Sequence, residues 1–574
     1  MLKYLKPYWY CCVLAPLFML GEIAMDMLQP AMMAVIVDDG VLGGNLPVIL
    51  SMGLKMVLLI VFGGTTGILC GVFANTAAQR VGNDIRKDLF GRIMDLSFRQ
   101  TDRFTTGSLV TRITNDVTQV EQMVMMSMRS IVRCSVMFVG GIVMLYLQSP
   151  RFALVVACGL PFLAAFVILF LRKVSPLFTV IQQKLDALNC LLQENIAGAR
   201  VVKAYVKEAD SLRQFGAAND ELCDINLRAQ SMLAFLNPCV NIVLNLCVVA
   251  VLYLGGVSVR TDGAITPGQI MASLTYLSLI LMRVIFMANI FQTFTRASAS
   301  WRRIREVLDT APEQRDGTAR PADSCRGRVE FRHVDFAYPD APDHPVLQDL
   351  SFTVEPGETV AIIGATGSGK TSLVQLIPRF YDVSAGTVRV DGVDVRDFAR
   401  QDLRQRIGIV QQKAELFSRS IAENIRWGRP EADDEAVTGA ARIAQAEDFI
   451  LRTPAGFETP VTEGGHSLSG GQKQRLSIAR AVLKRPEILI FDDSGSALDL
   501  RTEAALYDAL DAAFAGTTRL IVAQRIASVQ RADRILVLDN GRLCAEGTHR
   551  ELLATSPVYQ AICRSQLKKE VTAS

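Results

Sequence analysis

The hydrophobic pattern of the chain changes once, near residue 310. Before that point six long apolar segments alternate with polar connections, and several exceed the roughly 20 residues that a helix needs to span a bilayer. The segments lie at 10–37, 49–78, 127–148, 152–172, 233–257 and 267–295. We therefore expect a membrane domain over residues 1–310 with six spanning helices.

The connections between these segments differ in length and charge. Two of them, 79–126 and 173–232, are long, charged and rich in helix-favouring residues, and the others are short. Basic residues crowd the first long connection, whereas the short connections hold only Arg151 and Arg260. Because basic residues gather on the cytoplasmic side of spanning helices, we expect the long connections and both termini to be cytoplasmic.

From residue 328 onward the pattern is that of a soluble α/β domain. The stretch "TVAIIGATGSGKTSLVQLI" predicts a strand, a glycine-rich turn and a helix, while "VEFRHVDFAY", "EILIFDD" and "RLIVAQR" predict strands and "RILVLDNGRLCAEG" a hairpin. Such alternation favours a largely parallel sheet with its ligand at the carboxyl ends of the strands. We place this domain at 328–565, after a polar linker at 311–327 and before a tail at 566–574.

Composition narrows the class of protein. Half of the residues are hydrophobic (50%) and the mean hydropathy is positive, at +0.27, which favours a membrane protein. The net charge of +3 gives no reason to expect nucleic acid as a partner. The 12 cysteines show no metal-binding spacing, so we expect them to be small buried side chains in a reducing compartment.

The turn "GATGSGKT" fits the phosphate-binding loop Gly-x-x-x-x-Gly-Lys-Ser/Thr in full. Its backbone N–H groups and the following helix N-terminus hold phosphates, its lysine reaches the β- and γ-phosphates, and its last hydroxyl binds Mg²⁺. The predicted phosphate-binding residues are Gly364, Ala365, Thr366, Gly367, Ser368, Gly369, Lys370 and Thr371, followed by Ser372. Asp492, at the end of an apolar strand, is expected to be a second group on the metal.

A second anion-binding element lies in "LSGGQKQRLSIARAV", where a Ser-Gly-Gly turn opens a basic amphipathic helix. It follows the phosphate loop by about 100 residues of chain. A single nucleotide does not easily contact both the phosphate loop and this turn when they belong to the same domain. We therefore expect Ser469, Gly470, Gly471 and Gln472 to close on a nucleotide that another subunit holds.

With these ordered motifs the whole chain resembles an ATP-binding cassette (ABC) exporter half. The resemblance implies a type I exporter fold, in which a six-helix transmembrane domain is fused to an α/β P-loop nucleotide-binding domain, and a dimer that acts as an ATPase with ATP and Mg²⁺. It implies further roles for four positions: Tyr338 stacks on adenine, Gln412 contacts Mg²⁺, Glu463 contacts the coupling segments, and Asp499 lies at the dimer interface. It also implies short coupling helices near 101–110 and 203–214 and a place in the cytoplasmic (inner) membrane of a bacterium.

Two positions depart from the family pattern. Asp493 stands where the family has a glutamate that handles the attacking water, and Gln524 stands where it has a histidine. A carboxylate that is one methylene shorter is misplaced by about 1 Å, which can cost roughly 10²-fold in rate. Glutamine donates a hydrogen bond but carries neither a proton nor a positive charge.

With every binding motif intact, these departures predict a site that holds ATP and hydrolyses it poorly. We interpret the chain as the degenerate-site subunit of a heterodimeric, multidrug-type exporter, whose partner half-transporter has the glutamate and the histidine. Two alternatives remain open: a homodimeric lipid or peptide exporter with slow ATPase, and an ATP-sensing membrane regulator that does not pump. The apolar spans exclude a soluble ABC ATPase that acts on nucleic acid.

Candidate cavity residues lie in the first and sixth apolar segments. Glu22 and Asp26 share one helix face in the first segment, and Arg283 lies in the sixth. Charges at membrane depth are costly and usually face a cavity or one another. These residues therefore either pair within the bundle or contact the cargo, which we expect to be an amphipathic, drug-like or lipid-like small molecule.

Overall fold

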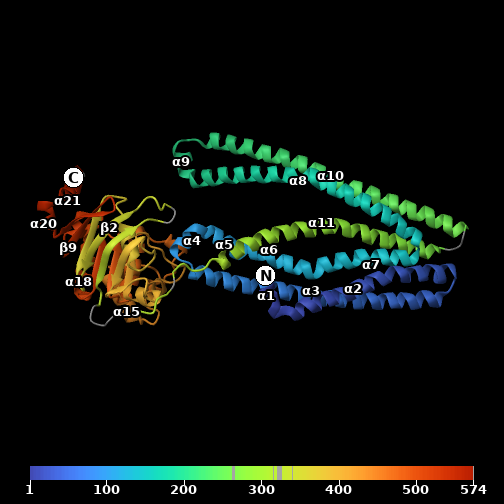
Figure 1. Cartoon of the computed structure of the whole chain (residues 1–574), viewed down its shortest axis with the longest axis horizontal. Helices are drawn as coiled ribbons and strands as arrows, with labels where there is room; N and C mark the ends of the chain where they lie inside the picture. The colour runs from blue at the N-terminus through green and yellow to red at the C-terminus, as the bar shows by residue number, and fades with distance from the viewer. Residues whose placement is uncertain (262–264, 315, 320–325, 339–340, 573–574) are drawn as a thin grey trace. The chain divides into compact units, whose positions relative to one another are not determined.

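The computed structural model describes residues 1–261, 265–314, 316–319, 326–338 and 341–572 (Figure 1). The chain divides into two compact units. The first comprises Met1–Met94 and Gly107–Thr310, and the second comprises Asp95–Thr106 and Ala311–Ser574. The short segment 95–106, which lies inside the predicted membrane domain by sequence, thus groups with the second unit.

The first unit is helical, with long helices joined by short ones. They are α1 (Leu2–Leu5), α2 (Trp9–Val35), α3 (Leu46–Asp95), α5 (Thr106–Thr111), α6 (Val117–Met126), α7 (Val132–Gln148), α8 (Pro150–Ala197), α9 (Ala199–Ala204), α10 (Glu208–Thr261) and α11 (Pro267–Asp309). Helical residues continue beyond the apolar segments, as expected for the long charged connections. Shorter irregular helical turns join α2 to its loop (Ile36–Leu42), α5 to α6 (Arg112–Asp116) and α6 to α7 (Ser127–Ile131).

Among the described residues, five helical stretches are long and apolar enough to cross a membrane: Leu2–Leu42, Leu46–Asp95, Thr106–Gln148, Pro150–Ala197 and Glu208–Thr261. They contain the first five predicted spans. The sixth predicted span, 267–295, falls within α11, where several side chains lie outside the described set. Large apolar side chains such as Leu54, Leu58 and Leu169 are exposed on the outer faces, as lipid contact requires.

Helix packing in the first unit places α11 against α2 and α7, and α8 along α10 (Figure 1). A buried cluster joins α7, α8, α10 and α11 through Leu145, Phe152, Val251 and Tyr276. The hydroxyl of Tyr276 donates to the backbone oxygen of Met27 across 2.6 Å, which ties α11 to α2. The cluster is apolar, and the buried Tyr276 hydroxyl beside it is paired, as burial away from water requires.

Short helices lie at the turns of the long connections. One is α4 (Phe98–Phe104), whose N-cap Ser97 forms a capping box with Gln100, and the other is α9. Both begin a few residues before the segments in which coupling helices were expected. The range 203–214 holds the end of α9 and the start of α10. The short helix α9 begins earlier than expected because α8 ends at Ala197 and α9 follows directly after Gly198.

The second unit contains two sheets. The larger has the order β10-β9-β3-β8-β7-β6, with β3 (Thr359–Gly364), β6 (Ile407–Val410), β7 (Ile488–Asp492), β8 (Thr518–Val522) and β9 (Arg534–Asp539) parallel and β10 (Arg542–Gly547) antiparallel. The smaller is antiparallel, in the order β2-β1-β4-β5: β1 (Val329–Phe336), β2 (Leu347–Val354), β4 (Ala385–Val390) and β5 (Val393–Asp394). Every predicted strand is present, and "RILVLDNGRLCAEG" is the β9–β10 hairpin.

The larger sheet is buried on both faces. Val360 and Ile362 of β3 face one apolar cluster, and Ala361 and Ile363 face another. This double burial explains why the parallel strands read as continuous apolar runs.

The helices of this unit are α12 (Lys370–Leu376), α13 (Arg400–Arg406), α14 (Ile421–Arg426), α15 (Asp434–Ile443), α16 (Glu447–Leu451), α17 (Gly470–Leu483), α18 (Leu500–Ala513), α19 (Ile526–Val529), α20 (His549–Thr555) and α21 (Pro557–Thr572).

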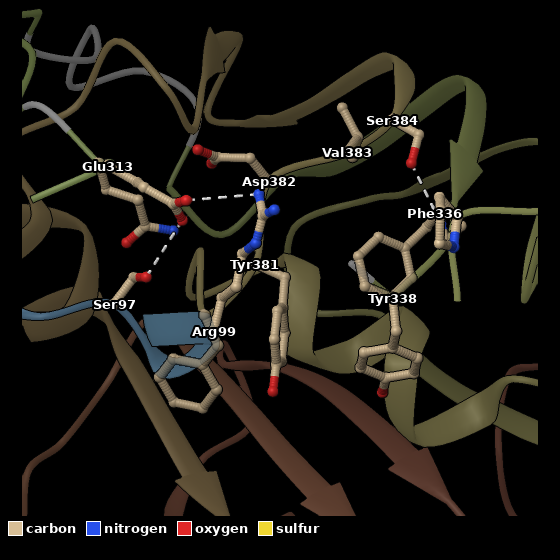
Figure 2. Close-up of a pocket in the computed structure, with 13 residues that line it drawn as sticks. Ser97, Arg99, Glu313, Phe336, Tyr338, Tyr381, Asp382, Val383 and Ser384 are labelled. Carbon is tan, nitrogen blue, oxygen red and sulfur yellow. Dashed lines mark hydrogen bonds and ion pairs between the residues drawn. The ribbon is translucent and has the colours of Figure 1, made fainter. Parts of the chain in front are cut away.

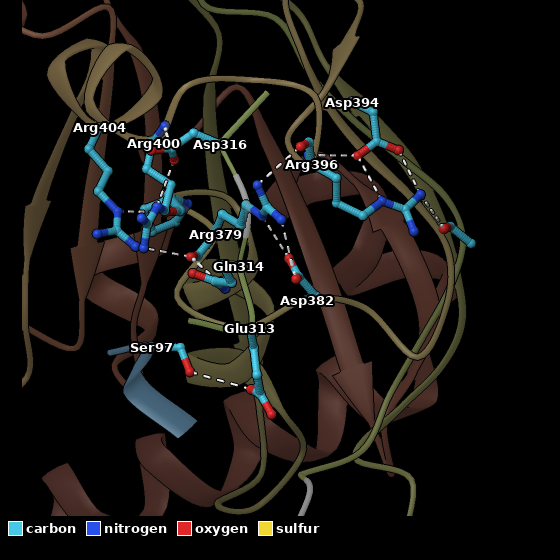
Figure 3. A network of polar contacts seen from close by, with 12 residues as sticks. Ser97, Glu313, Gln314, Asp316, Arg379, Asp382, Asp394, Arg396, Arg400 and Arg404 are labelled. Carbon is cyan, nitrogen blue, oxygen red and sulfur yellow. Dashed lines mark hydrogen bonds and ion pairs between the residues drawn. The ribbon is translucent and has the colours of Figure 1, made fainter. Parts of the chain in front are cut away.

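The start of the predicted linker is held by polar contacts (Figure 3). Arg400 Nε donates to Asp316 Oδ1 across 2.7 Å, and the Gln314 amide donates to the backbone oxygen of Arg379 across 3.3 Å. Gln100 of α4 donates to the backbone oxygen of Ala311 across 2.8 Å. These contacts account for the grouping of segment 95–106 and residues 311–319 with the second unit.

Candidate nucleotide site

The predicted phosphate loop connects the end of β3 to the start of α12. Gly367 and Gly369 have φ of +83° and +95°, in the left-handed region that favours glycine. A Cβ on Gly364 would lie 2.2 Å from the backbone oxygen of Leu538, so only glycine fits there. The glycines of the motif are therefore required by the backbone of the loop itself.

Lys370 opens α12, and its side chain bends back over the loop. Its ammonium donates to the backbone oxygens of Gly364 and Ala365 at 2.9 and 2.8 Å. Burial lowers the pKa of Lys370, and the neighbouring Asp493 and Asp492 oppose that shift. Ala365, Thr366 and Gly367 are exposed, so the outer rim of the loop is open to a phosphate chain. A cationic donor with free backbone N–H groups around it fits a polyphosphate.

The Thr371 hydroxyl and Asp492 form the pair expected of a metal site. The hydroxyl donates to Asp492 Oδ1 across 2.8 Å, joining α12 to the end of β7. Burial raises the pKa of Asp492, and the hydrogen bond from Thr371 opposes that shift. A hydroxyl and a buried carboxylate beside a phosphate loop are oxygen donors of the kind that Mg²⁺ takes. The residues present therefore fit Mg²⁺.

Asp493 accepts two side-chain amides on a single oxygen. Gln524 Nε2 donates to Asp493 Oδ2 across 2.8 Å, and Gln412 Nε2 donates to the same atom across 3.2 Å. Asp493 has φ of +48° and is 8% exposed, and burial raises the pKa of its carboxyl group. The structure thus brings both departures from the family pattern into direct contact, together with the glutamine that was expected near the metal.

Tyr338 lies beside α12, where an adenine-stacking residue was expected. Its hydroxyl forms a 2.9 Å hydrogen bond with Ser372 Oγ, and its ring packs edge-on against Phe336 and Tyr381. It also lines a pocket of about 800 Å³ (Figure 2). The opposite side of that pocket carries Ser97, Arg99 and Glu313, where Arg99 and Glu313 form an ion pair at 3.4 Å.

The second anion-binding element is built as predicted at the start of α17. Ser469 is the N-cap, and it forms a capping box with Gln472 while Gly470 and Gly471 form the first turn. Ser469 and Gln472 bond to each other, the Gly471 oxygen accepts from Arg475, and within the described part of the chain none of these hydrogen bonds reaches the phosphate loop. A cap of this kind leaves the first-turn N–H groups available to an acceptor outside the chain.

Two further predicted interface residues also lie away from the phosphate loop. Glu463 is exposed in a short helical turn, Glu463–Gly465, that precedes the Leu-Ser-Gly-Gly-Gln signature at 468–472. Asp499 is exposed and caps α18, where its carboxylate accepts from the backbone N–H and the hydroxyl of Thr502 at 2.9 and 2.8 Å. Its local role is therefore a helix cap, whatever else it contacts in an assembly.

In the membrane unit, Glu22 and Asp26 share one cation, Arg133 of α7. The guanidinium lies 2.9 Å from Glu22 Oε1 and 3.1 Å from Asp26 Oδ2. Arg283 does not join them: its Nε is buried without a hydrogen-bond partner among the described residues. The sequence identified the two acids but not Arg133, because only the packing of α2 against α7 shows that their faces meet.

Sequence reasoning also missed two residues around Gln524. Arg525 donates to the backbone oxygens of Leu498 and Ser496 at 3.1 and 3.2 Å, and Gln566 of α21 contacts the backbone on both sides of Arg525. Arg525 follows Gln524 directly and could have been singled out by that position. Gln566 lies in the predicted tail, 566–574, and no local pattern marks it.

Comparison with known proteins agrees with this geometry. Residues 12–284 match the family model of the ABC transporter transmembrane region, and residues 347–496 match the family model described as ABC transporter. An uncharacterised ABC transporter ATP-binding protein of Bacillus subtilis, YfiB, is 39% identical over 100% of this chain and 99% of its own length. An ATP-dependent lipid A-core flippase of Syntrophus aciditrophicus is 33% identical over 93% of this chain and 88% of its own length. A solved bacterial Atm1-family ABC exporter with ATP bound superposes with a TM-score of 0.80 at 29% identity, covering 97% of this chain and 99% of that one.

Proposed function

This chain belongs to the ABC transporter family as an exporter with fused membrane and ATP-binding domains, and we propose that it is the degenerate-site subunit of a heterodimer. The observation that carries the proposal is the environment of Asp493. Its Oδ2 is engaged by the amides of Gln524 and Gln412, and neither amide can take up or carry a proton. A carboxylate held in this way is poorly placed to orient or activate a water.

The rest of the site supports ATP binding. Lys370 supplies the charge for the β- and γ-phosphates, and Tyr338 supplies a ring beside the loop for the adenine. Thr371, Gln412 and Asp492 are the groups that would hold Mg²⁺, which neutralises phosphate charge when it is bound. The chain therefore retains the parts that hold a nucleotide and lacks the parts that hydrolyse it quickly.

The intact signature gives the chain its second role. Ser469, Gly470, Gly471 and Gln472 form a well-capped helix start, and its first-turn glycine N–H groups can meet the γ-phosphate of a nucleotide on the partner. The partner we propose is a second half-transporter with glutamate and histidine at its catalytic positions. ATP at both interfaces would bring the nucleotide-binding domains together, and hydrolysis at the competent site would separate them.

For the cargo we propose amphipathic small molecules, drug-like or lipid-like, exported across the bacterial cytoplasmic membrane with both termini in the cytoplasm. The similarity to a lipid A-core flippase supports an amphipathic cargo. The group of Glu22, Asp26 and Arg133 carries two acids for one base, and Glu22 Oε2 is buried without a partner among the described residues. A net negative site at membrane depth favours a cargo with a cationic group.

The test compares ATP hydrolysis by the full-length chain with that of the Asp493→Glu/Gln524→His variant, both in lipid nanodiscs. We expect the wild-type chain to bind ATP with slow turnover and the double variant to gain at least about 10-fold, since misplacement of a catalytic group by about 1 Å costs up to 10²-fold. The control is Lys370→Ala, in which both binding and turnover are lost. Equal rates for the wild-type chain and the double variant would contradict a degenerate site.

Assembly is tested by co-expression with a half-transporter that carries the glutamate and the histidine. Native mass measurement should show a one-to-one complex whose dye efflux exceeds that of either chain alone. A stable, transport-competent homodimer of this chain would instead favour the homodimeric exporter. Absence of both ATPase and efflux with any such partner would favour an ATP-sensing regulator.

A further inference from the structure

The segment that carries Gln524 is held from outside the sheet by the C-terminal helix α21. Gln566 Nε2 donates to the backbone oxygen of Gln524 across 2.5 Å, and the backbone N–H of Ile526 donates to Gln566 Oε1 across 2.9 Å. One side-chain amide thus completes two complementary hydrogen bonds with residues on both sides of Arg525. This is the pairing that an amide makes with the edge of a strand, and it fixes both the position and the direction of the segment.

The helix that presents Gln566 is firmly anchored. Tyr559 is fully buried and Cys563 is 5% exposed, and both belong to the apolar cluster beneath the larger sheet. The spacing of 559, 563 and 566 places these three residues on one helix face. The Tyr559 hydroxyl also contacts His549 Nδ1 at 2.7 Å, which ties α21 to α20. Gln566 therefore extends from a rigid support.

We call the two hydrogen bonds of Gln566 the clasp, and they hold the backbone of the residue whose side chain contacts Asp493. The backbone of Gln524 is held by Gln566, and the side chain of the same residue donates to Asp493 Oδ2 across 2.8 Å. On the other side, Arg525 binds the backbone oxygens of Ser496 and Leu498, in the segment between Asp493 and Asp499. The position of the Gln524 amide is therefore set by contacts to two separate elements, α21 and the segment before α18.

We propose that Gln566 is a positioning residue for ATP hydrolysis: through the backbone of Gln524 it sets where the Gln524 side chain meets Asp493. The C-terminal helix is then part of the nucleotide site, although it contributes no atom to the ligand. Loss of the clasp frees the Gln524 segment without touching Lys370 or Tyr338. The rate of hydrolysis depends on Gln566, and the affinity for ATP does not.

The experiment uses the full-length chain in lipid nanodiscs and measures single-turnover hydrolysis of radiolabelled ATP and binding of a fluorescent ATP analogue. Gln566→Met keeps the length of the side chain and removes both hydrogen bonds. We expect a single-turnover rate that is higher by up to roughly 10-fold, because a Gln524 amide that is no longer held in place restrains Asp493 less, and an affinity that changes less than about 2-fold. The matched control is Gln560→Met on the same helix, whose amide donates to the backbone oxygen of Leu553 at 2.9 Å.

A double-variant cycle separates positioning from general destabilisation. In a Gln524→Ala background the amide that Gln566 positions is absent, so Gln566→Met should change the rate less than about 2-fold. Equal fold-changes in both backgrounds, or an equal change in Gln560→Met, would overturn the proposal. The comparison is a ratio of rates, so its outcome does not depend on how slow the wild-type site is.

A second variant covers the case in which Gln566→Met folds poorly. In Gln566→Glu the ionised carboxylate can accept from Ile526 but faces the Gln524 backbone oxygen with no proton, whereas the protonated acid restores both hydrogen bonds. The rate of this variant should therefore approach the wild-type rate as the pH falls from about 6 to 4, the range in which a glutamate carboxyl takes up its proton. A ratio that is independent of pH would contradict the clasp.

Discussion

The Thr371 hydroxyl donates to Asp492 Oδ1 across 2.8 Å and joins the first turn of α12 to the end of β7. Through this contact the phosphate loop and the strand carboxylate are held together, as the proposed Mg²⁺ site requires. We predict that Thr371→Ala or Asp492→Asn weakens Mg²⁺-dependent ATP binding by about 10-fold or more, as loss of a metal-site group typically does.

Mg²⁺ titration of ATP binding by the full-length chain measures this effect. The matched control is Thr438→Ala, which removes a hydroxyl on the surface of α15 that donates to the backbone oxygen of Asp434 at 2.8 Å. That variant should match the wild-type protein. An unchanged Mg²⁺ dependence in Thr371→Ala would argue against a metal at this pair.

A second prediction concerns the ion group in the membrane unit. Arg133→Met leaves Glu22 and Asp26 without their cation, and the free energy of unfolding should fall by roughly 3 kcal/mol, the usual cost of removing one partner from a largely buried pair. Thermal unfolding in detergent, followed by intrinsic fluorescence, measures the loss. The triple variant Glu22→Gln/Asp26→Asn/Arg133→Met should recover most of it, since no charge is then left unpaired.

The control for this second prediction is Arg129→Met, since Arg129 is an exposed arginine one turn earlier in the same stretch. A similar melting temperature for Arg129→Met and Arg133→Met would show that the two acids do not depend on Arg133. Efflux by the triple variant then shows whether the three charges also matter for transport, because this variant is stable although the charges are absent.

Much of the fold could be predicted from local sequence pattern, whereas contacts between residues far apart in the chain could not. Continuous apolar runs predicted β3, β7 and β8 because both faces of their sheet are buried, and the glycine spacing predicted the loop before α12 because two of its glycines need positive φ. Arg133 and Gln566 could not be predicted in the same way. Their partners lie 107 residues away in Asp26 and 42 residues away in Gln524, and only helix packing brings them together.

A third prediction concerns acid sensitivity at the start of the linker. The hydrogen bond from Arg400 lowers the pKa of Asp316 in the folded protein below its unfolded value of about 3.9. The contact therefore stabilises the fold above about pH 4 and is lost as the pH falls through the lowered pKa. Because the Asp316 side chain is half exposed (53%), its contribution is at most about 1 kcal/mol.

Asp316→Asn should therefore lower the melting temperature slightly at pH 7, and the difference from wild type should shrink between pH 5 and pH 3. Melting curves across this range measure it, with Asp343→Asn, at an exposed loop aspartate, as the control. A difference that grows toward low pH would have the wrong sign for this pair.

The last prediction separates two roles of Asp499, a helix cap that the structure shows and a dimer contact that the family resemblance implies. Asn caps a helix about as well as Asp, so Asp499→Asn should keep the bond to the Thr502 N–H and the melting temperature, whereas Asp499→Ala should lower the melting temperature. If the charge also communicates with the opposite site, both variants should slow ATP hydrolysis by the assembled transporter. Asp433→Ala, which removes the cap of α15, is the control that should lower the melting temperature and leave hydrolysis unchanged. If Asp499→Asn hydrolyses ATP at the wild-type rate, Asp499 acts as a helix cap and its charge has no role in communication between the sites.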